Sequence, residues 1–177
     1  MEMKYKFPKV EVDIDGKGDK VNPQLIVRNS YDGGWKFGLM LGAFRLVCSN
    51  GLVIGKTMYM LKQLHYESLD LDRVRLELGD ALNKFSTQTK IWEKWVSRVV
   101  KSEEYEETMG VMDFSTKDTE QVISDINKKE NLTKKNQLTM WLFYNIITAF
   151  ITHQVRSQNK RVTLEDRARR AFDKYNK

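Results

Sequence analysis

The chain contains one cysteine, two histidines and two prolines among its 177 residues. A single cysteine cannot form a disulfide within the chain, and Cys48 with two histidines cannot build an ordinary structural zinc site unless carboxylates complete it. We therefore expect no bound metal and no cofactor. Cys48 is interpreted as a small buried apolar residue, because free cysteine is among the most buried residue types.

Long apolar runs and common catalytic motifs are also missing. No stretch approaches the roughly eighteen apolar residues of a membrane span, and the first residues, MEMKYK, lack the apolar core of a signal peptide. We expect no membrane association and a protein that stays in the compartment where it is made. The absence of GxxxxGK(S/T), HExxH and GxSxG patterns excludes the commonest ATPases, zinc proteases and hydrolases, so no catalytic residue is assigned.

Length and composition are those of a single domain. A chain of 177 residues with 41% hydrophobic content can bury one sizeable core. Local patterns divide it into a sheet-rich part (1–66), a helical part (67–155) and a basic helical carboxy-terminal segment (156–177). This order predicts an α+β fold, in which an antiparallel β-meander is followed by a long amphipathic helix and a helical carboxy-terminal half.

The meander is predicted from residues 25–56, which contain three alternating strand patterns. Residues 31–34 (YDGG) tolerate positive φ, and Asn50-Gly51 is the favoured pair for a two-residue hairpin. Arg45 lies among aliphatic neighbours in one strand, whereas Asn29, Asp32 and Asn50 lie at the flanking turns. We call these four residues the polar hairpin cluster. Two interpretations are possible for Arg45. In one, Asp32 is its ion partner and the guanidinium is held inside the sheet; in the other, Arg45 contacts a phosphate-bearing ligand.

Helical periodicity follows residue 66. Apolar residues recur at threes and fours from 71 to about 100, which predicts one long helix with Asp70 as its cap and with Trp92 and Trp95 in the core. Residues 58–65 are either a terminal strand or a short approach to this helix. An acidic patch is predicted in residues 103–110, where the helix ends and a loop begins. Further helices are expected from 115 or 116 to 126, from 134 to about 154 after a Thr133 cap, and from 163 onward.

Two features predict assembly into a homo-oligomer. The helix expected over 134–154 is apolar around more than half its circumference, so it should lie centrally or face a second subunit. The acidic patch of Glu103, Glu104, Glu106 and Glu107 is interpreted as a solvated surface or as a contact for the basic region of a neighbouring copy.

Positive charge is concentrated at the carboxy-terminal end. Residues 128–177 hold twelve Lys and Arg against four Asp and Glu, whereas the preceding residues hold eighteen against twenty. Such a region is typical of a nucleic-acid-binding surface, although a solvated surface is the simpler alternative. The candidate contacts for single-stranded DNA or RNA are Arg45, Lys134, Lys135, Arg156, Lys160, Arg161, Arg167, Arg169 and Arg170.

Two motifs carry a resemblance to a known family. Residues 29–33 (NSYDG) followed by 44–52 (FRLVCSNGL), and then 141–153 (WLFYNIITAFITH), are similar to the phage/plasmid-like protein family, a domain of unknown function. The similarity covers roughly residues 20–155. Tyr31 stands where that family often has histidine, and the amino-terminal portion is shorter. The resemblance implies an origin in a mobile element and a place in the cytoplasm of a bacterial host cell.

These observations favour a phage or mobile-element DNA-metabolism protein that binds single-stranded nucleic acid without sequence preference. The expected architecture is similar in outline to annealing proteins of the Rad52 type. One alternative is a non-enzymatic protein that binds and inhibits a host enzyme or defence system. Another is an enzyme whose polar hairpin cluster lines a phosphate pocket. Asn145 and His153 lie two turns apart on one helix, and His153 is interpreted as a structural histidine, because no nucleophile or carboxylate partner is evident.

Overall fold

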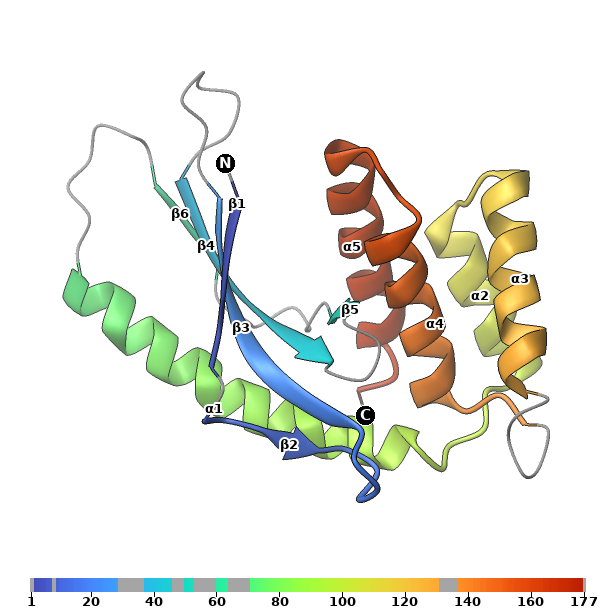
Figure 1. The fold of residues 1–177 in the computed structure, drawn as a ribbon, viewed down its shortest axis with the longest axis horizontal. Helices are drawn as coiled ribbons and strands as arrows, with labels where there is room; N and C mark the ends of the chain where they lie inside the picture. Colours follow the sequence, from blue (N-terminus) through green and yellow to red (C-terminus); the bar gives the residue numbers. More distant parts are fainter. Residues whose placement is uncertain are drawn as a thin grey trace.

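A computed structural model describes residues 2–7, 9–28, 37–45, 50–52, 60–63, 71–130 and 137–176. Within these ranges a six-stranded antiparallel sheet precedes five helices, so the predicted α+β class is confirmed (Figure 1). The strands are β1 (Glu2–Lys6), β2 (Val12–Asp13), β3 (Lys20–Arg28), β4 (Phe37–Arg45), β5 (Asn50–Leu52) and β6 (Met60–Gln63). The helices are α1 (Leu71–Trp95), α2 (Ser102–Met112), α3 (Thr116–Glu130), α4 (Met140–His153) and α5 (Gln158–Asp173).

The long strands β3 and β4 form the centre of the sheet. Strands β1 and β2 pair in succession with one side of β3, whereas β4 pairs with its other side and also with β5 and β6. Pro23 lies in β3 opposite the end of β1, where the N–H of Phe7 donates to the Pro23 carbonyl at 3.0 Å. Because proline has no N–H to return, the ladder with β1 ends there and β2 continues it.

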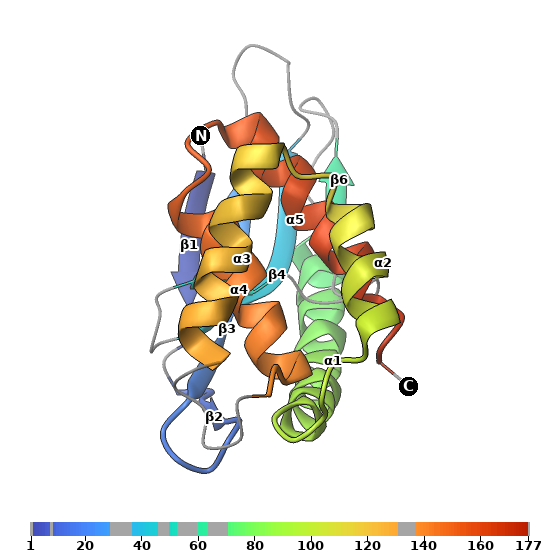
Figure 2. The ribbon, with the colours of Figure 1, turned by 90° about the vertical axis from the view of Figure 1, so that its right-hand side faces the viewer.

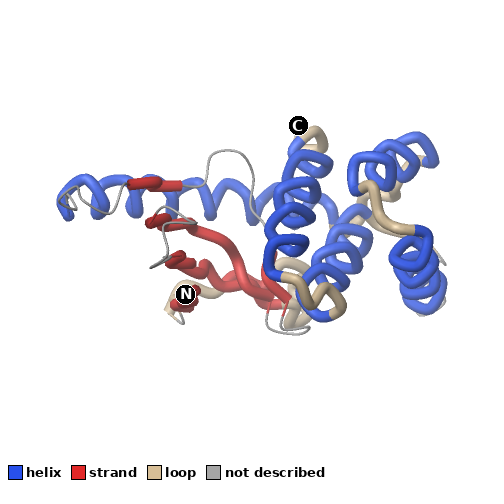
Figure 3. The backbone as a smooth tube through the Cα atoms, turned by 90° about the horizontal axis from the view of Figure 1, so that it is seen from above, coloured by secondary structure: helices blue, strands red, loops and turns tan. Residues whose placement is uncertain are grey.

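The helices lie along one side and one end of the sheet. Helix α1 runs beneath the strands and contacts β4, whereas α4 contacts β5 at the end of the sheet (Figure 1). Helices α2 and α3 lie beyond α4 and α5, on the side away from the strands, which Figure 2 shows from that end. Seen from above, α1 extends past the outer strands while the other four helices form a separate group (Figure 3).

One continuous core joins the sheet to the helices. Ile14, Val21 and Ala43 from the sheet belong to the same buried cluster as the aromatic residues of the helices. Helix α4 is central, because ten of its fourteen residues are buried. Each large apolar side chain buried in this way contributes about 1.5–3 kcal/mol. The rings that meet around α4 are those of Trp92, Trp95, Trp141, Phe143, Tyr144 and Phe172.

The burial of α4 distinguishes the two positions predicted for this helix, the centre of the fold and a contact with a second subunit. Its apolar circumference is covered by the chain itself, with Trp141, Phe143 and Ile147 all at 5% exposure or less. The expectation that it lies centrally is confirmed. This helix therefore gives no reason to expect a second subunit.

Several predicted boundaries are wrong. The long helix ends at Trp95, because the β-branched residues that follow pair with the start of α4: Val99 bridges Thr139, and the Val100 N–H donates to the Leu138 carbonyl at 2.9 Å. Residues 102–112 form the separate helix α2. Thr139 caps α4 by accepting from the Leu142 N–H at 3.3 Å, and Thr133, the predicted cap, lies outside the described residues.

Two further corrections concern the last helix and the meander. Helix α5 begins at Gln158 with Ser157 as its cap, whereas Thr163, the predicted start, lies inside it. Asn50 and Gly51 are not a hairpin turn, because both lie in β5, opposite Arg45 and Phe44. The connection between β4 and β5 is formed by residues 46–49, which are not described. Residues 60–63, left open above, form a strand.

Candidate functional site

Arg45 lies at the end of β4 and points into the interior of the protein. Its Nε and Nη2 atoms donate to the two carboxylate oxygens of Asp19, at 2.6 and 2.7 Å. The side chains of Arg45 and Asp19 are only 14% and 8% exposed. A two-point contact of this kind fixes the guanidinium plane as well as its position. Arg45 is therefore held inside the fold, as one of the two interpretations predicted.

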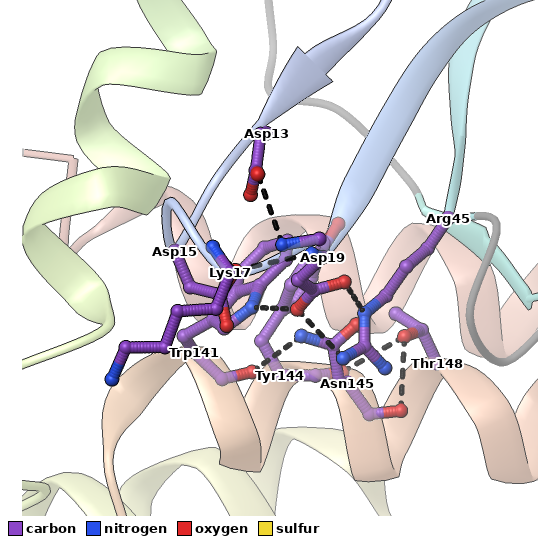
Figure 4. Close-up of polar contacts among 10 residues, drawn as sticks. Asp13, Asp15, Lys17, Asp19, Arg45, Trp141, Tyr144, Asn145 and Thr148 are labelled. Carbon is purple, nitrogen blue, oxygen red and sulfur yellow. Dashed lines mark hydrogen bonds and ion pairs between the residues drawn. The ribbon is translucent and has the colours of Figure 1, made fainter.

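Trp141 at the start of α4 completes this contact (Figure 4). Its indole N–H donates to Asp19 Oδ2 at 2.8 Å, and the Arg45 guanidinium carbon lies 5.9 Å from the centre of its ring. The geometry is that of a cation–π contact beside a charged hydrogen bond. We call Asp19, Arg45 and Trp141 the sheet–helix tie, because they join the turn between β2 and β3, strand β4 and helix α4.

A tight turn between β2 and β3 delivers Asp19 to this position. Gly16 and Gly18 take positive φ values of 66° and 103°, which glycine adopts without strain. Asp15 accepts hydrogen bonds from the N–H groups of Lys17 and Asp19, and Asp13 accepts one from Gly18. Burial raises the pKa of Asp15, but the bonds from Asp19 and Lys17 outweigh it, so this pKa lies below its usual value. The carboxylates of Asp13 and Asp15 therefore stabilise the turn itself.

Asp19 is a partner of Arg45 that the sequence analysis did not name. Asp32 and Asn29 lie outside the described residues, and of Asn50 only the backbone is described, paired with Arg45 across the β4–β5 ladder. Asp19 was missed although a signal existed: it lies two residues before Val21, which is directly opposite Arg45 in the β3–β4 register. Finding it required the register of two strands, which local sequence does not specify.

Asn145 and His153 are not brought together. Asn145 is 1% exposed, and its Nδ2 donates to the Trp141 carbonyl at 2.7 Å, while its Oδ1 is buried without a hydrogen-bond partner. His153 is exposed at the last position of α4. Eight residues of helix separate the two by about 12 Å. Asn145 is thus part of the packing beside the sheet–helix tie.

The cations of the carboxy-terminal segment are mostly engaged within the chain. Lys160 contacts Asp118 of α3 at 2.7 Å, and Arg167 contacts Asp113 at 3.0 Å and the Met112 carbonyl at the end of α2. Arg169 and Arg170 contact Asp166 at 2.5 and 3.0 Å. Arg161 donates to the Val155 carbonyl at 2.9 Å. Arg156 is exposed and has no carboxylate partner in the described ranges, whereas Lys134 and Lys135 lie outside them.

Two glutamates of the acidic patch on α2 form ion pairs within the same copy, one of them with the carboxy-terminal segment. Glu107 contacts Lys174, and Glu104 contacts Arg98 at 2.5 Å. The hydrogen bond from Lys174 lowers the pKa of Glu107, and the one from Lys160 lowers the pKa of Asp118 against the opposing effect of burial. The expected acid-to-base contact between copies is, for these two glutamates, a contact within one chain.

Unpaired positive charge lies instead on α1. The side of this helix that faces away from the core carries three exposed lysines and two exposed carboxylates, Asp80 and Glu93. None of the three lysines has an ion-pair partner anywhere in the described part of the chain. We call this surface the α1 lysine face; its members are Asp80, Asn83, Lys84, Ser86, Thr87, Lys90, Glu93 and Lys94.

The α1 lysine face follows from the same periodicity that predicted the core. The buried residues Ala81, Phe85 and Trp92 define the inner side of α1, so the residues between them point outward. Lys84 and Lys94 are ten residues apart, which places them about 15 Å apart along the helix axis. Sequence reasoning missed this surface, because it counted charge along the chain and not around the helix.

Other kinds of site find no support in the described residues. They contain no group of three or more His, Cys, Asp or Glu that could hold a metal ion. None of their helices combines the length and the apolar character that crossing a membrane requires.

A family model described as a domain of unknown function, DUF932, matches residues 3–173. No curated protein and no solved structure matches the chain.

Proposed function

The chain belongs to the DUF932 family of domains of unknown function, and from this starting point we propose that it binds single-stranded nucleic acid without sequence preference. The observation that carries the proposal is the α1 lysine face. An exposed lysine with no carboxylate partner keeps its full charge available for a phosphate. Lysine is also a point charge on a flexible stem, which suits backbone contact better than the reading of base edges.

The surroundings of the lysines support the same function. Asn83, Ser86 and Thr87 are exposed beside them and offer short polar side chains of the kind that contact phosphates and sugars. Asp80 and Glu93 are the two carboxylates on the face, against three lysines. A flexible single strand can follow such a row of cations along one helix without the groove fit that a rigid duplex demands.

The residues that the sequence first pointed to have a smaller part in this proposal. Arg45 is committed to Asp19, and four of the carboxy-terminal cations have carboxylate partners, so their charge is already compensated. Arg156 remains a candidate contact. The resemblance to the phage/plasmid-like family adds the expectation that the nucleic acid belongs to a mobile element, and an annealing activity of the Rad52 type stays part of this proposal.

A salt titration with a thymine oligonucleotide tests the function. The logarithm of the affinity should fall linearly with the logarithm of the salt concentration, with a slope of about −0.7 per phosphate contacted. Replacing Lys84, Lys90 and Lys94 together by Gln removes three such contacts. The slope should become shallower by about 2, and affinity at low salt should fall more than tenfold.

The matched control removes the same charge elsewhere. Lys9, Lys17 and Lys117 are exposed and, among the described residues, have no carboxylate partner; they lie outside α1. Their joint replacement by Gln lowers the net charge equally and should leave the slope nearly unchanged. An equal loss in both triple variants would mean that only net charge matters. Absence of binding by the unaltered protein at low salt would refute the function.

A further inference from the structure

Leu76 of α1 has the most exposed large hydrophobic side chain among the described residues, at 74%. It precedes the buried Phe85 by nine residues, which is about two and a half turns of helix, so the two side chains lie on opposite sides of α1. Leu76 belongs to the amino-terminal part of the helix, which lies beyond the outer strands at the left of Figure 1. Packing in the core therefore does not account for this leucine.

Leu76 continues the α1 lysine face toward the start of the helix. Lys94 follows it by eighteen residues, about five full turns, so both lie on the same side of α1. Steps of three or four residues connect them through exposed positions only, and residues so spaced are neighbours on a helix surface. These positions are Leu76, Gly79, Asn83, Thr87, Lys90 and Lys94. A strand that binds the lysines and continues along the helix therefore reaches Leu76.

Gly79 lies between Leu76 and the lysines, and the fold does not require a glycine there. Its φ is not positive, unlike that of Gly16 or Gly18. A Cβ added to Gly79 would meet no atom within 4 Å. Glycine inside a helix is less stable than alanine, so this residue lowers stability without a gain in backbone geometry or packing. What it provides is open space in front of the helix, into which a ligand can approach closely.

The charge around Leu76 differs from the charge around the lysines. Arg75 contacts Asp72 at 3.3 Å, and Asp80 is exposed. Among the described side chains from 72 to 80, carboxylates thus outnumber cations, and a phosphate gains little here. A nucleobase is uncharged and has an apolar face. Bases therefore suit the stretch around Leu76, whereas phosphates suit the lysines.

We propose that Leu76 and Gly79 form a base-contact site, at which Leu76 packs against the face of an unpaired nucleobase. The base belongs to the strand whose phosphates contact the α1 lysine face, so the inference rests on the proposed function and deepens it. Leucine is one of the apolar side chains that proteins place against unstacked bases. Contact with the face of a base tolerates any sequence, because every base has such a face.

The base-contact site selects the class of nucleic acid that binds. In a duplex the faces of the bases are stacked on one another, so Leu76 has nothing to contact without unstacking them. In a flexible single strand the faces are accessible. Leu76 therefore adds to the affinity for single strands and not to the affinity for duplexes.

Two oligonucleotides of equal length and charge test the proposal: a thymine strand, and an abasic strand that keeps the phosphates but lacks the bases. Leu76→Ala removes most of the apolar contact and keeps a good helix former. It should lower the affinity for the thymine strand about five- to tenfold. The affinity for the abasic strand, the affinity for a duplex and the slope of the salt dependence should stay unchanged. Ile123→Ala, at a 39% exposed residue of α3, is the matched control and should leave every affinity unchanged.

A pair of glycine variants separates close approach from helix stability. Gly79 and Gly110 both lie inside helices, and at neither would an added Cβ meet an atom within 4 Å. Gly79→Ala and Gly110→Ala should each raise the melting temperature by about 2–4 °C. Only Gly79→Ala should weaken binding of the thymine strand, by about twofold or more, because its methyl group occupies the space that the base approaches.

The outcomes distinguish this inference from the function on which it rests. Equal losses for the thymine and abasic strands in Leu76→Ala, or no loss for either, would overturn the base-contact site and leave the lysine contacts standing. Unchanged affinity for the thymine strand in Gly79→Ala would overturn the part assigned to the glycine. An unaltered protein that binds neither strand at low salt would refute the proposed function, and the base-contact site with it.

Discussion

Among individual residues, Asp19 has a buried carboxylate that accepts three side-chain hydrogen bonds, two from Arg45 and one from Trp141. A charged pair taken out of water is stable only while each member keeps its partner. Removing one member leaves a buried charge uncompensated, which costs far more than the loss of an exposed pair.

We predict that Arg45→Ala and Asp19→Ala each lower the free energy of unfolding by about 3 kcal/mol. The double variant should lose little more than either single one, because the penalty of the unpaired charge disappears. Chemical denaturation of the four proteins measures this cycle. As a control, Lys20→Ala breaks the exposed pair of Lys20 with Glu11 and should cost less than about 1 kcal/mol. An unchanged stability in Arg45→Ala would contradict the sheet–helix tie.

The sequence predicted half of this arrangement. An arginine in an aliphatic strand indicated an internal buttress, which the structure contains. Its carboxylate comes from a turn 26 residues earlier in the chain, and its tryptophan from a helix formed much later. Neither partner is close enough to Arg45 in the sequence to form a local pattern with it. Composition and periodicity could therefore identify Arg45 but not its partners.

Among the elements, the sequence predicted four helices where the described residues form five, because α2 is separate from α1, and several predicted starts are wrong. Serine and threonine are frequent before each of them, and either residue can cap a helix or lie inside it. Thr163 has its hydroxyl bonded to the Asn159 carbonyl at 3.1 Å, inside α5, whereas Ser157 accepts from the Lys160 N–H at 3.4 Å at its start. The choice between them depends on where the chain leaves α4.

This difference predicts opposite results for two similar substitutions. Ser157→Ala removes the cap of α5 and should lower the free energy of unfolding by about 1 kcal/mol. Thr163→Ala replaces an exposed helical threonine by the best helix former and should leave stability unchanged or raise it by up to about 0.7 kcal/mol. Thermal and denaturant unfolding of both variants provides the measurement. A larger loss in Thr163→Ala than in Ser157→Ala would mean that α5 starts later.

For the whole molecule, charge along the chain and charge in space differ. The carboxy-terminal segment is strongly basic in sequence, yet Lys160, Arg167 and Lys174 contact carboxylates that lie 42 to 67 residues away. The α1 lysine face does not stand out as basic in the sequence, yet its three lysines are exposed in the fold. A net charge counted along the chain therefore does not identify the surface whose charges stay unpaired.

The shared core predicts cooperative unfolding of the whole chain. Because Ile14, Val21 and Ala43 pack in one cluster with the helical residues, the sheet cannot separate without exposing the interior of the helices. Tryptophan fluorescence, which reports on the junction, and far-ultraviolet circular dichroism, which reports on the helices, should give coincident denaturation curves. Two separated transitions would indicate that the sheet and the helices unfold independently.

The sheet–helix tie also has a consequence for synthesis on the ribosome. Asp19 and Arg45 leave the ribosome long before Trp141, which follows about 100 residues later. At about 5–20 residues per second, the nascent sheet waits roughly 5–20 seconds for α4. During this interval α1 can cover part of the sheet, but the buried residues that pack against α4 have no partner, so the growing chain stays exposed to aggregation until α4 emerges.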